Sequence, residues 1–147
     1  MSRSILVVCT GNICRSPYGE EKLRKLLPNF EVASAGLATK MNRLSGKKAD
    51  SLAIKVASEF GVDISGHKAQ QITQKLIDEH DLILVMEPRQ KEALCDYHPA
   101  DSHKIHLFGK WVGLEHIDDP YRQGKHAFLA AFTAIDKSAQ AWADNLA

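Results

Sequence analysis

The stretch "ILVVCTGNICRSP" (residues 5–17) decides how the chain begins to fold. Four aliphatic residues run directly into Cys9. A continuous apolar run of this kind predicts a β-strand that is covered on both faces. Ser16 and Pro17 predict the N-cap and the first helical position of a helix that extends to about Leu27. The stretch therefore predicts a strand, a loop and a helix in direct succession, with a cysteine where the strand ends.

The same alternation continues along the rest of the chain. Three further apolar runs are typical of strands: 30–36, 81–86 and 104–109. Each is followed by a pattern typical of an amphipathic helix: 49–61, 88–98 and 128–146. This order predicts an α/β fold with a parallel sheet and helices on both faces. Ligands of such sheets lie beyond the carboxyl ends of the strands, so we expect the loop after Cys9 to form the site.

Composition limits the classes of function. A chain of 147 residues with 44% hydrophobic content predicts a single domain over residues 1–147. The formal charge of +1 gives no global attraction for nucleic acid or a membrane surface. The apolar run at residues 5–9 is too short for a signal peptide or a membrane span, which predicts a cytoplasmic protein without stable membrane insertion. Three cysteines without Cys-x-x-Cys spacing also suit a reducing compartment.

The loop after the first strand has the features of an anion cradle. Gly11 and Asn12 tolerate the left-handed backbone that turns successive N–H groups inward, and the start of the following helix adds partial positive charge. No Gly-Lys-Ser/Thr follows, so the loop is not a Walker loop. Arg15 instead offers a planar fork that holds two phosphate oxygens. A sulfur at Cys9 beneath a bound phosphoryl group is a nucleophile aimed at phosphorus.

A bare Cys-x5-Arg spacing carries little information, because most free cysteines are small buried side chains. The preceding strand, the Gly-Asn pair and the helix start make the combined pattern specific. Ser16 is placed to donate a hydrogen bond to the sulfur of Cys9, in addition to its N-cap role.

Nucleophilic attack on a phosphate ester also needs a general acid for the leaving oxygen. The segment "IDDPYRQG" supplies the best candidate, Asp119, because the following proline favours an extended loop conformation. Asp118 is its neighbouring competitor, and both acids also suit an ordinary turn. Tyr121 and the aliphatic part of Arg122 are expected to wall an aromatic substrate.

"VCTGNICRSP" together with "DPY" about a hundred residues later resembles the low-molecular-weight protein tyrosine phosphatase family over nearly the whole chain. The resemblance implies a flavodoxin-like three-layer sandwich with a four-stranded parallel sheet in the order 2-1-3-4. It implies that Cys9 is the nucleophile, Arg15 the phosphate clamp and Asp119 the general acid and base, with no metal and no cofactor. The other implied residues are those that bind phosphate (Thr10, Gly11, Asn12, Ile13, Cys14, Ser16) and those that support the loop (Asn12, Ser16, Ser34, His67).

Two features depart from the family pattern. The long loop over residues 37–51 lacks the aromatic residue that many members place on the second wall of the pocket, and Met41 or Leu44 is expected to replace it. Gln70 stands where the family usually has an arginine. The same loop carries four cations that either attract acidic or multiply phosphorylated segments or are simply solvated: Lys40, Arg43, Lys47 and Lys48.

Cys14 has two interpretations, a packing residue or the partner in a reversible Cys9–Cys14 disulfide that protects the nucleophile from deeper oxidation. Two other functions occur on the same fold. Thiol-dependent arsenate reductases need a further cysteine pair, whereas only Cys95 remains here, in a predicted helix. Phosphoarginine phosphatases resemble this sequence except for a threonine in place of Ile13, so Ile13 favours tyrosine.

The motifs are most similar to those of bacterial members that act on the tyrosine-rich tails of autokinases in exopolysaccharide or capsule production. The resemblance therefore implies a phosphotyrosine protein as partner, in particular an autokinase tail. We expect a monomer, with a weak dimer as the alternative.

Overall fold

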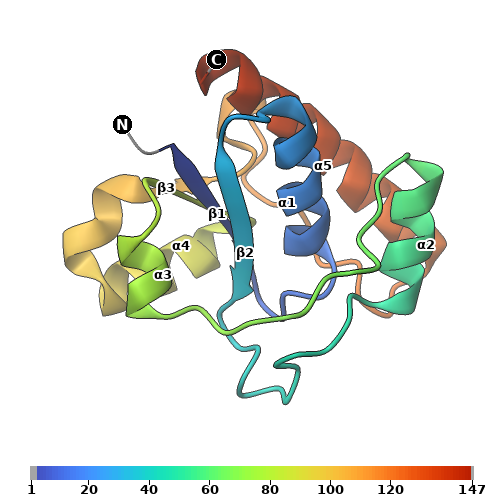
Figure 1. Ribbon diagram of the computed structural model, residues 1–147, viewed down its shortest axis with the longest axis horizontal. Helices are drawn as coiled ribbons and strands as arrows, with labels where there is room; N and C mark the ends of the chain where they lie inside the picture. The colour runs from blue at the N-terminus through green and yellow to red at the C-terminus, as the bar shows by residue number, and fades with distance from the viewer. Residues whose placement is uncertain (1–2, 147) are drawn as a thin grey trace.

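A four-stranded parallel sheet forms the centre of the computed structural model, which describes residues 3–146 (Figure 1). The strand order is β2-β1-β3-β4, as predicted. The central strand β1 pairs with β2 on one side and with β3 on the other, so Cys9 lies opposite Gly36 at the carboxyl end. The four strands are β1 (Ser4–Cys9), β2 (Glu31–Gly36), β3 (Leu82–Val85) and β4 (Ile105–Leu107).

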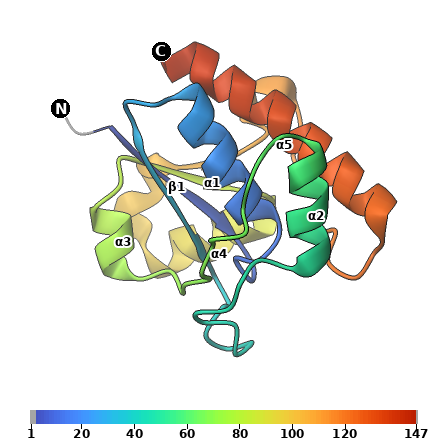
Figure 2. The ribbon, with the colours of Figure 1, turned by 45° about the vertical axis from the view of Figure 1, so that its right-hand side comes forward.

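Helices cover both faces of the sheet and complete the predicted three layers. One face is covered by α1 (Arg15–Leu26) and α5 (Lys125–Leu146), with α2 (Ser51–Glu59) packed beside them (Figures 1 and 2). The other face is covered by α3 (Gln74–Asp78) and α4 (Pro88–Tyr97).

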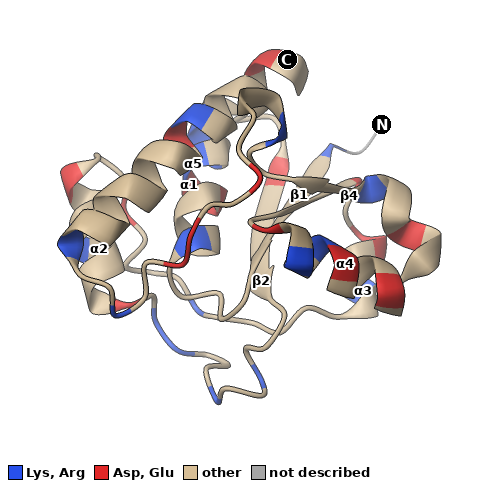
Figure 3. Cartoon of the chain, turned by 180° about the vertical axis from the view of Figure 1, so that it is seen from behind, with Lys and Arg blue, Asp and Glu red and all other residues tan. Residues whose placement is uncertain are grey.

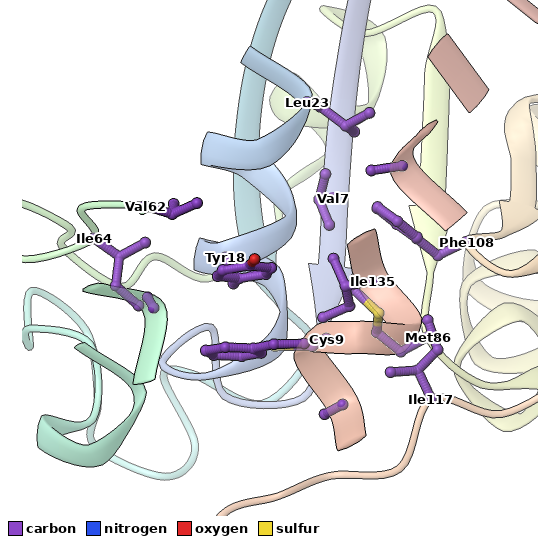
Figure 4. Close-up of a cluster of buried hydrophobic side chains, with 14 of the residues drawn as sticks. Val7, Cys9, Tyr18, Leu23, Val62, Ile64, Met86, Phe108, Ile117 and Ile135 are labelled. Carbon is purple, nitrogen blue, oxygen red and sulfur yellow. The ribbon is translucent and has the colours of Figure 1, made fainter. Parts of the chain in front are cut away.

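Alternate residues of the strands enter two separate apolar clusters. Val7 and Cys9 pack in the larger cluster with α1, α2 and α5, whereas Leu6 and Val8 pack toward α3 and α4. Figure 4 shows Cys9 among the side chains of the larger cluster, near Met86 and Ile117. The base of the predicted loop is therefore seated in the core, which limits its freedom to move.

Local sequence explains where α2 and α4 begin. Asp50 caps α2 by accepting hydrogen bonds from the N–H groups of Leu52 and Ala53. Glu87 and Gln90 form a capping box at the start of α4, which Pro88 opens. Gly61 has a φ of 76° just beyond α2, which is the left-handed conformation expected of the predicted stop.

Several boundaries differ from the prediction. Ser16 is not the N-cap of α1, because the helix begins at Arg15 and Cys14 is its N-cap, without a side-chain capping bond. The short helix α3 and the 3₁₀ turns at Pro99–Lys104 and Lys110–Val112 were not predicted, since five residues or fewer leave little periodicity and turns leave none. The last helix begins at Lys125 rather than at residue 128.

The predicted inner face of α5 is confirmed. Phe132 stacks on Tyr18 of α1 with ring centroids 4.0 Å apart, and Trp142 donates its indole N–H to the carbonyl of Phe108. Between residues 3 and 146, no helix has the length and apolar character needed to cross a bilayer.

Candidate active site

A pocket of about 200 Å³ opens at the carboxyl end of β1. Its floor and one wall come from the loop between β1 and α1. The remaining walls come from two distant segments, the 37–50 loop and the 117–121 loop. The residues that line it are Cys9, Thr10, Gly11, Ile13, Cys14, Arg15, Asn42, Leu44, Asp119 and Tyr121.

The sulfur of Cys9 lies at the base of this pocket, with the residue only 3% exposed. The backbone N–H of Asn12 donates to Sγ at 3.3 Å, and Ser16 Oγ lies 3.0 Å from Sγ. Amide and hydroxyl donors around a sulfur stabilise negative charge on it. The predicted position of Ser16 beside the sulfur is therefore observed.

The orientation of the Asn12 side chain decides which group donates to the sulfur. Its Oδ1 accepts from the backbone N–H of Gln70 at 2.9 Å, so its Nδ2 must face the two serines. Nδ2 donates to Ser16 Oγ at 2.7 Å and to Ser34 Oγ at 2.9 Å. Because Ser16 Oγ already accepts this bond, its own proton is free to point at Cys9 Sγ.

The backbone conformation at position 12 also favours asparagine. Its φ is 60°, a left-handed conformation that asparagine adopts more readily than most residues. His67 donates from Nε2 to the carbonyl of Asn12 at 2.6 Å and so holds the same peptide from outside. Burial lowers the pKa of His67, which favours the neutral ring.

A buried carboxylate ends this network on the far side of the loop, and the sequence analysis missed it. Ser34 Oγ donates to Glu20 Oε1 at 2.5 Å, and Arg24 pairs with Glu20 Oε2 at 2.8 Å. Burial raises the pKa of Glu20, whereas the bonds from Ser34 and Arg24 oppose that rise. Glu20 lies one helical turn after Ser16, so only its burial on α1 distinguishes it from a surface acid.

Gln70 supports the same network. Its backbone N–H orients Asn12, and its side chain donates from Nε2 to the carbonyl of Ser34 at 2.9 Å. The departure from the family's arginine therefore leaves a residue that still holds the loop, through its backbone.

Arg15 is held in place from below and left open toward the pocket. Its Nη1 donates to the carbonyl of Ile117 at 2.7 Å and to Glu87 Oε2 at 3.2 Å. Its Nε is buried and has no hydrogen-bond partner among residues 3–146. Because a buried donor without an acceptor is costly, an anion in the pocket is the natural partner for this guanidinium. Glu87 was not predicted, although a Glu-Pro pair at the end of a buried strand was a usable signal.

The structure separates the two candidate acids. Asp119 lines the pocket, and its Oδ2 lies 3.8 Å from Arg15 Nη2. Its Oδ1 accepts from the N–H of Tyr121 at 3.1 Å, a bond that fixes the loop. Asp118 does not line this pocket; it borders only a second hollow beside α5, which Asp119 also borders. Proximity to Arg15 therefore favours Asp119.

The outer walls differ in part from the prediction. Leu44 and Tyr121 line the pocket, but Met41 is 83% exposed and is not among the lining residues. Met41 lies on the outer side of a turn, and Asn42, which was not predicted, takes the place on the wall. Arg122 does not line the pocket either, and its guanidinium lies 5.0 Å from the centroid of the Tyr121 ring.

The remaining cysteines have distinct surroundings. Cys14 is buried beside the pocket as a free thiol, and burial is the main cause that raises its pKa. Cys95 lies in α4 and packs against the second apolar cluster rather than on the pocket. Within the part of the chain that the structure describes, no three His, Cys, Asp or Glu residues are grouped as metal ligands.

Comparison with known proteins identifies the family. The model of the low molecular weight phosphotyrosine protein phosphatase family matches residues 4–147. The chain belongs to this family. It is 46% identical over 146 residues to the low molecular weight protein-tyrosine-phosphatase Wzb of Salmonella typhi, a match that covers 99% of this chain and 95% of Wzb.

Solved structures of such phosphatases have the same fold. Vibrio vulnificus Wzb in complex with benzylphosphonate is 53% identical and superposes with a TM-score of 0.95, over 99% of this chain and 100% of that one. Wzb from Escherichia coli K30 in complex with sulphate is 40% identical with a TM-score of 0.94, over the full length of both chains. The chain is thus a low-molecular-weight protein-tyrosine-phosphatase, and the predicted family, fold and class of enzyme are confirmed.

Proposed function

We propose that this phosphatase hydrolyses phosphotyrosine through a phosphocysteine on Cys9, with Arg15 as phosphate clamp and Asp119 as general acid and base. The observation that carries the proposal is the convergence of these three residues on one pocket, with the sulfur at its base. In this scheme residues 1–147 work as one domain.

In the first step the Cys9 thiolate attacks phosphorus in line with the leaving oxygen. An S–P bond forms, the P–O bond to the tyrosine breaks, and Asp119 gives its proton to the departing phenolate. Arg15 and the loop N–H groups stabilise the charge on the three equatorial oxygens, with Thr10, Gly11, Asn12, Ile13, Cys14 and Ser16 forming the cradle. Tyr121 and Leu44 flank the tyrosine ring.

In the second step Asp119, now a carboxylate, takes a proton from water. The water attacks phosphorus, the S–P bond breaks and inorganic phosphate leaves. Ser16 donates its hydroxyl proton toward the departing sulfur, a direction that Asn12 and Ser34 impose through the network described above. The scheme uses no metal and no cofactor.

The physiological partner that we propose is a phosphotyrosine protein, specifically the tyrosine-rich tail of an autokinase that controls exopolysaccharide or capsule production in the bacterial cytoplasm. The similarity to the Wzb and AmsI phosphatases supports this choice. Incubation with an autophosphorylated tail, followed by mass spectrometry of each tyrosine, tests it. Retention of every phosphate, while a short phosphotyrosine peptide is hydrolysed, would reject the partner but not the chemistry.

The chemistry is tested by phosphate release from a phosphotyrosine peptide in excess chelator. Cys9→Ser should lower the rate by at least about a thousandfold, since the nucleophile is lost. Asp119→Asn should lower it by about a hundredfold or more, and less for an aryl phosphate with a good leaving group. The matched control Asp118→Asn should stay within about threefold. Equal losses in the two aspartate variants would contradict the role of Asp119.

A further inference from the structure

The 37–50 segment between β2 and α2, here called the basic arm, lies at the mouth of the pocket and has a pronounced positive charge. Figure 3 shows blue bands along this segment at the lower end of the molecule. Its only acid, Asp50, is already used to cap α2. Its four cations are all exposed, and none has an ion pair within residues 3–146: Lys40, Arg43, Lys47 and Lys48.

The basic arm is joined directly to the phosphate-binding loop. The N–H groups of Leu37 and Ala38 donate to the carbonyls of Cys9 and Thr10 at 3.0 and 2.9 Å. The hydroxyl of Thr39 donates to the carbonyl of Gly11 at 2.9 Å. These bonds fix the start of the arm relative to the nucleophile.

The middle and the end of the arm are also held. Gly46 and Lys47 exchange backbone hydrogen bonds with Ala69, both at 2.8 Å, and the N–H of Asp50 donates to the carbonyl of Ile13 at 2.8 Å. Leu44 packs so closely on the loop that a Cβ at Gly11 would lie 3.0 Å from its Cδ1. A surface ordered before binding loses less conformational entropy when a ligand docks.

The opposite rim has the opposite charge. Asp119 lies on the opposite wall of the pocket, in a segment that also carries Glu115 and Asp118, and red bands mark that segment in Figure 3. A phosphotyrosine peptide seated in the pocket has its neighbouring residues between these two rims. Acidic side chains are attracted by the arm, and basic ones by the acids of the opposite rim.

We propose that the basic arm binds aspartate and glutamate side chains that flank the phosphotyrosine, so that the enzyme prefers acidic phosphopeptides. This inference rests on the proposed function and names the substrate class of the same pocket. Four unpaired cations on an ordered segment that lines the pocket carry it. The contribution is made in binding, so it appears in KM and depends on salt, because exposed pairs are screened.

The test compares peptides that carry one phosphotyrosine and differ only in three flanking residues, either Glu or Gln, placed before or after it. The parent should show about a tenfold higher kcat/KM for at least one Glu peptide over its Gln counterpart, as expected for a few exposed pairs acting together. This preference should fall to about twofold between ~20 mM and ~300 mM salt.

Two variants that each remove four positive charges distinguish an effect of the basic arm from an effect of the protein's net charge. Replacing Lys40, Arg43, Lys47 and Lys48 by Gln should abolish the preference and leave phenyl phosphate hydrolysis unchanged. The control replaces four lysines that do not line the pocket and should keep the preference: Lys55, Lys75, Lys91 and Lys137.

Three outcomes overturn the inference: no preference for Glu in the parent, a preference that salt does not reduce, or an equal loss in both variants. The salt series needs only the parent, so it decides even if the arm variant folds poorly. Failure of the proposed function looks different, because the parent would then hydrolyse neither phenyl phosphate nor the Gln peptides.

Discussion

At the scale of single residues, Asn12 does more than its loop position suggests. It accepts from a backbone N–H that is 58 residues away in sequence and donates to two serines, one of which contacts the sulfur of Cys9. Because both serine hydroxyls accept from Asn12, the proton of Ser16 can be donated to Cys9 and that of Ser34 to Glu20. Such networks are effective when every member is satisfied and costly when one is removed.

The replacement Asn12→Gly tests this role without backbone strain, because glycine adopts a φ of 60° freely. We expect kcat to fall by about tenfold or more, since Ser16 and Ser34 each lose a donor. Gln70→Ala is the matched control and should stay within about threefold, because its contact with Asn12 comes from the backbone. Kinetics on an aryl phosphate measure both, and a normal kcat in Asn12→Gly would remove the network from the mechanism.

Cys14 is the second prediction at this scale. Peroxide should convert the Cys9 thiolate to a sulfenic acid with release of hydroxide, and the Cys14 thiol should then displace water from that sulfenic acid to form the disulfide. The parent should therefore recover its activity on treatment with dithiothreitol, whereas Cys14→Ser should be inactivated irreversibly. Mass spectrometry that shows no Cys9–Cys14 bridge in the oxidised parent would contradict the protective role.

At the scale of elements, the close approach of β2 to the loop between β1 and α1 depends on Gly36. A Cβ there would lie 2.1 Å from Thr39 Oγ1 and 2.7 Å from the carbonyl oxygen of Thr10. Thr39 belongs to the basic arm and Thr10 to the loop between β1 and α1, and hydrogen bonds between these two segments hold both in place. The glycine at the end of β2 is thus required by space, not by its own φ.

Gly36→Ala should lower the free energy of unfolding by about 1–3 kcal/mol, as expected of an overpacked site, and should also reduce activity because the loop must shift. Gly66→Ala serves as control, since a Cβ there has nothing within 4 Å and its φ is not in the left-handed region. Urea unfolding measures the difference. Equal stability of the two variants would show that the loop adjusts without cost.

At the scale of the whole molecule, His67 links stability to pH. Its pKa is lowered in the folded protein, whereas in the unfolded chain it is about 6.5. Above that value neither state binds the proton; below it only the unfolded state does, so stability is lost as pH falls from about 6.5 toward the folded pKa.

His67→Gln keeps a donor for Asn12 but cannot titrate. The free energy of unfolding of the parent should therefore fall relative to that of the variant between pH 7 and pH 5, by no more than about 1.4 kcal/mol per pH unit for one proton. Urea titrations at several pH values measure this difference. Parallel pH profiles for the two proteins would show that His67 does not carry the dependence.

Features that depend on neighbouring residues followed from the sequence alone. An apolar run, a loop with Gly-Asn and a helix start are adjacent in the chain, so the position of Cys9 and Arg15 at the carboxyl end of β1 followed from local periodicity. The alternation of elements likewise predicted the parallel sheet, and the family resemblance predicted its order. The start of α1 did not follow from the local pattern, because Ser16 suited both an N-cap and a contact with sulfur.

Only the tertiary structure decided which distant residues complete the site. Glu87 and Ile117 hold Arg15, Gln70 orients Asn12, and Asp119 rather than its neighbour faces the pocket. Each is more than fifty residues from the group that it serves, and nothing in the local pattern encodes which loop side chains converge when the chain folds. The turn that exposes Met41 is closed by local bonds, such as that from the N–H of Asn42 to the carbonyl of Ala38. Its position at the pocket, which brings Asn42 to the wall, depends on the bonds of Ala38 and Thr39 to the loop after β1, a segment far away in the sequence.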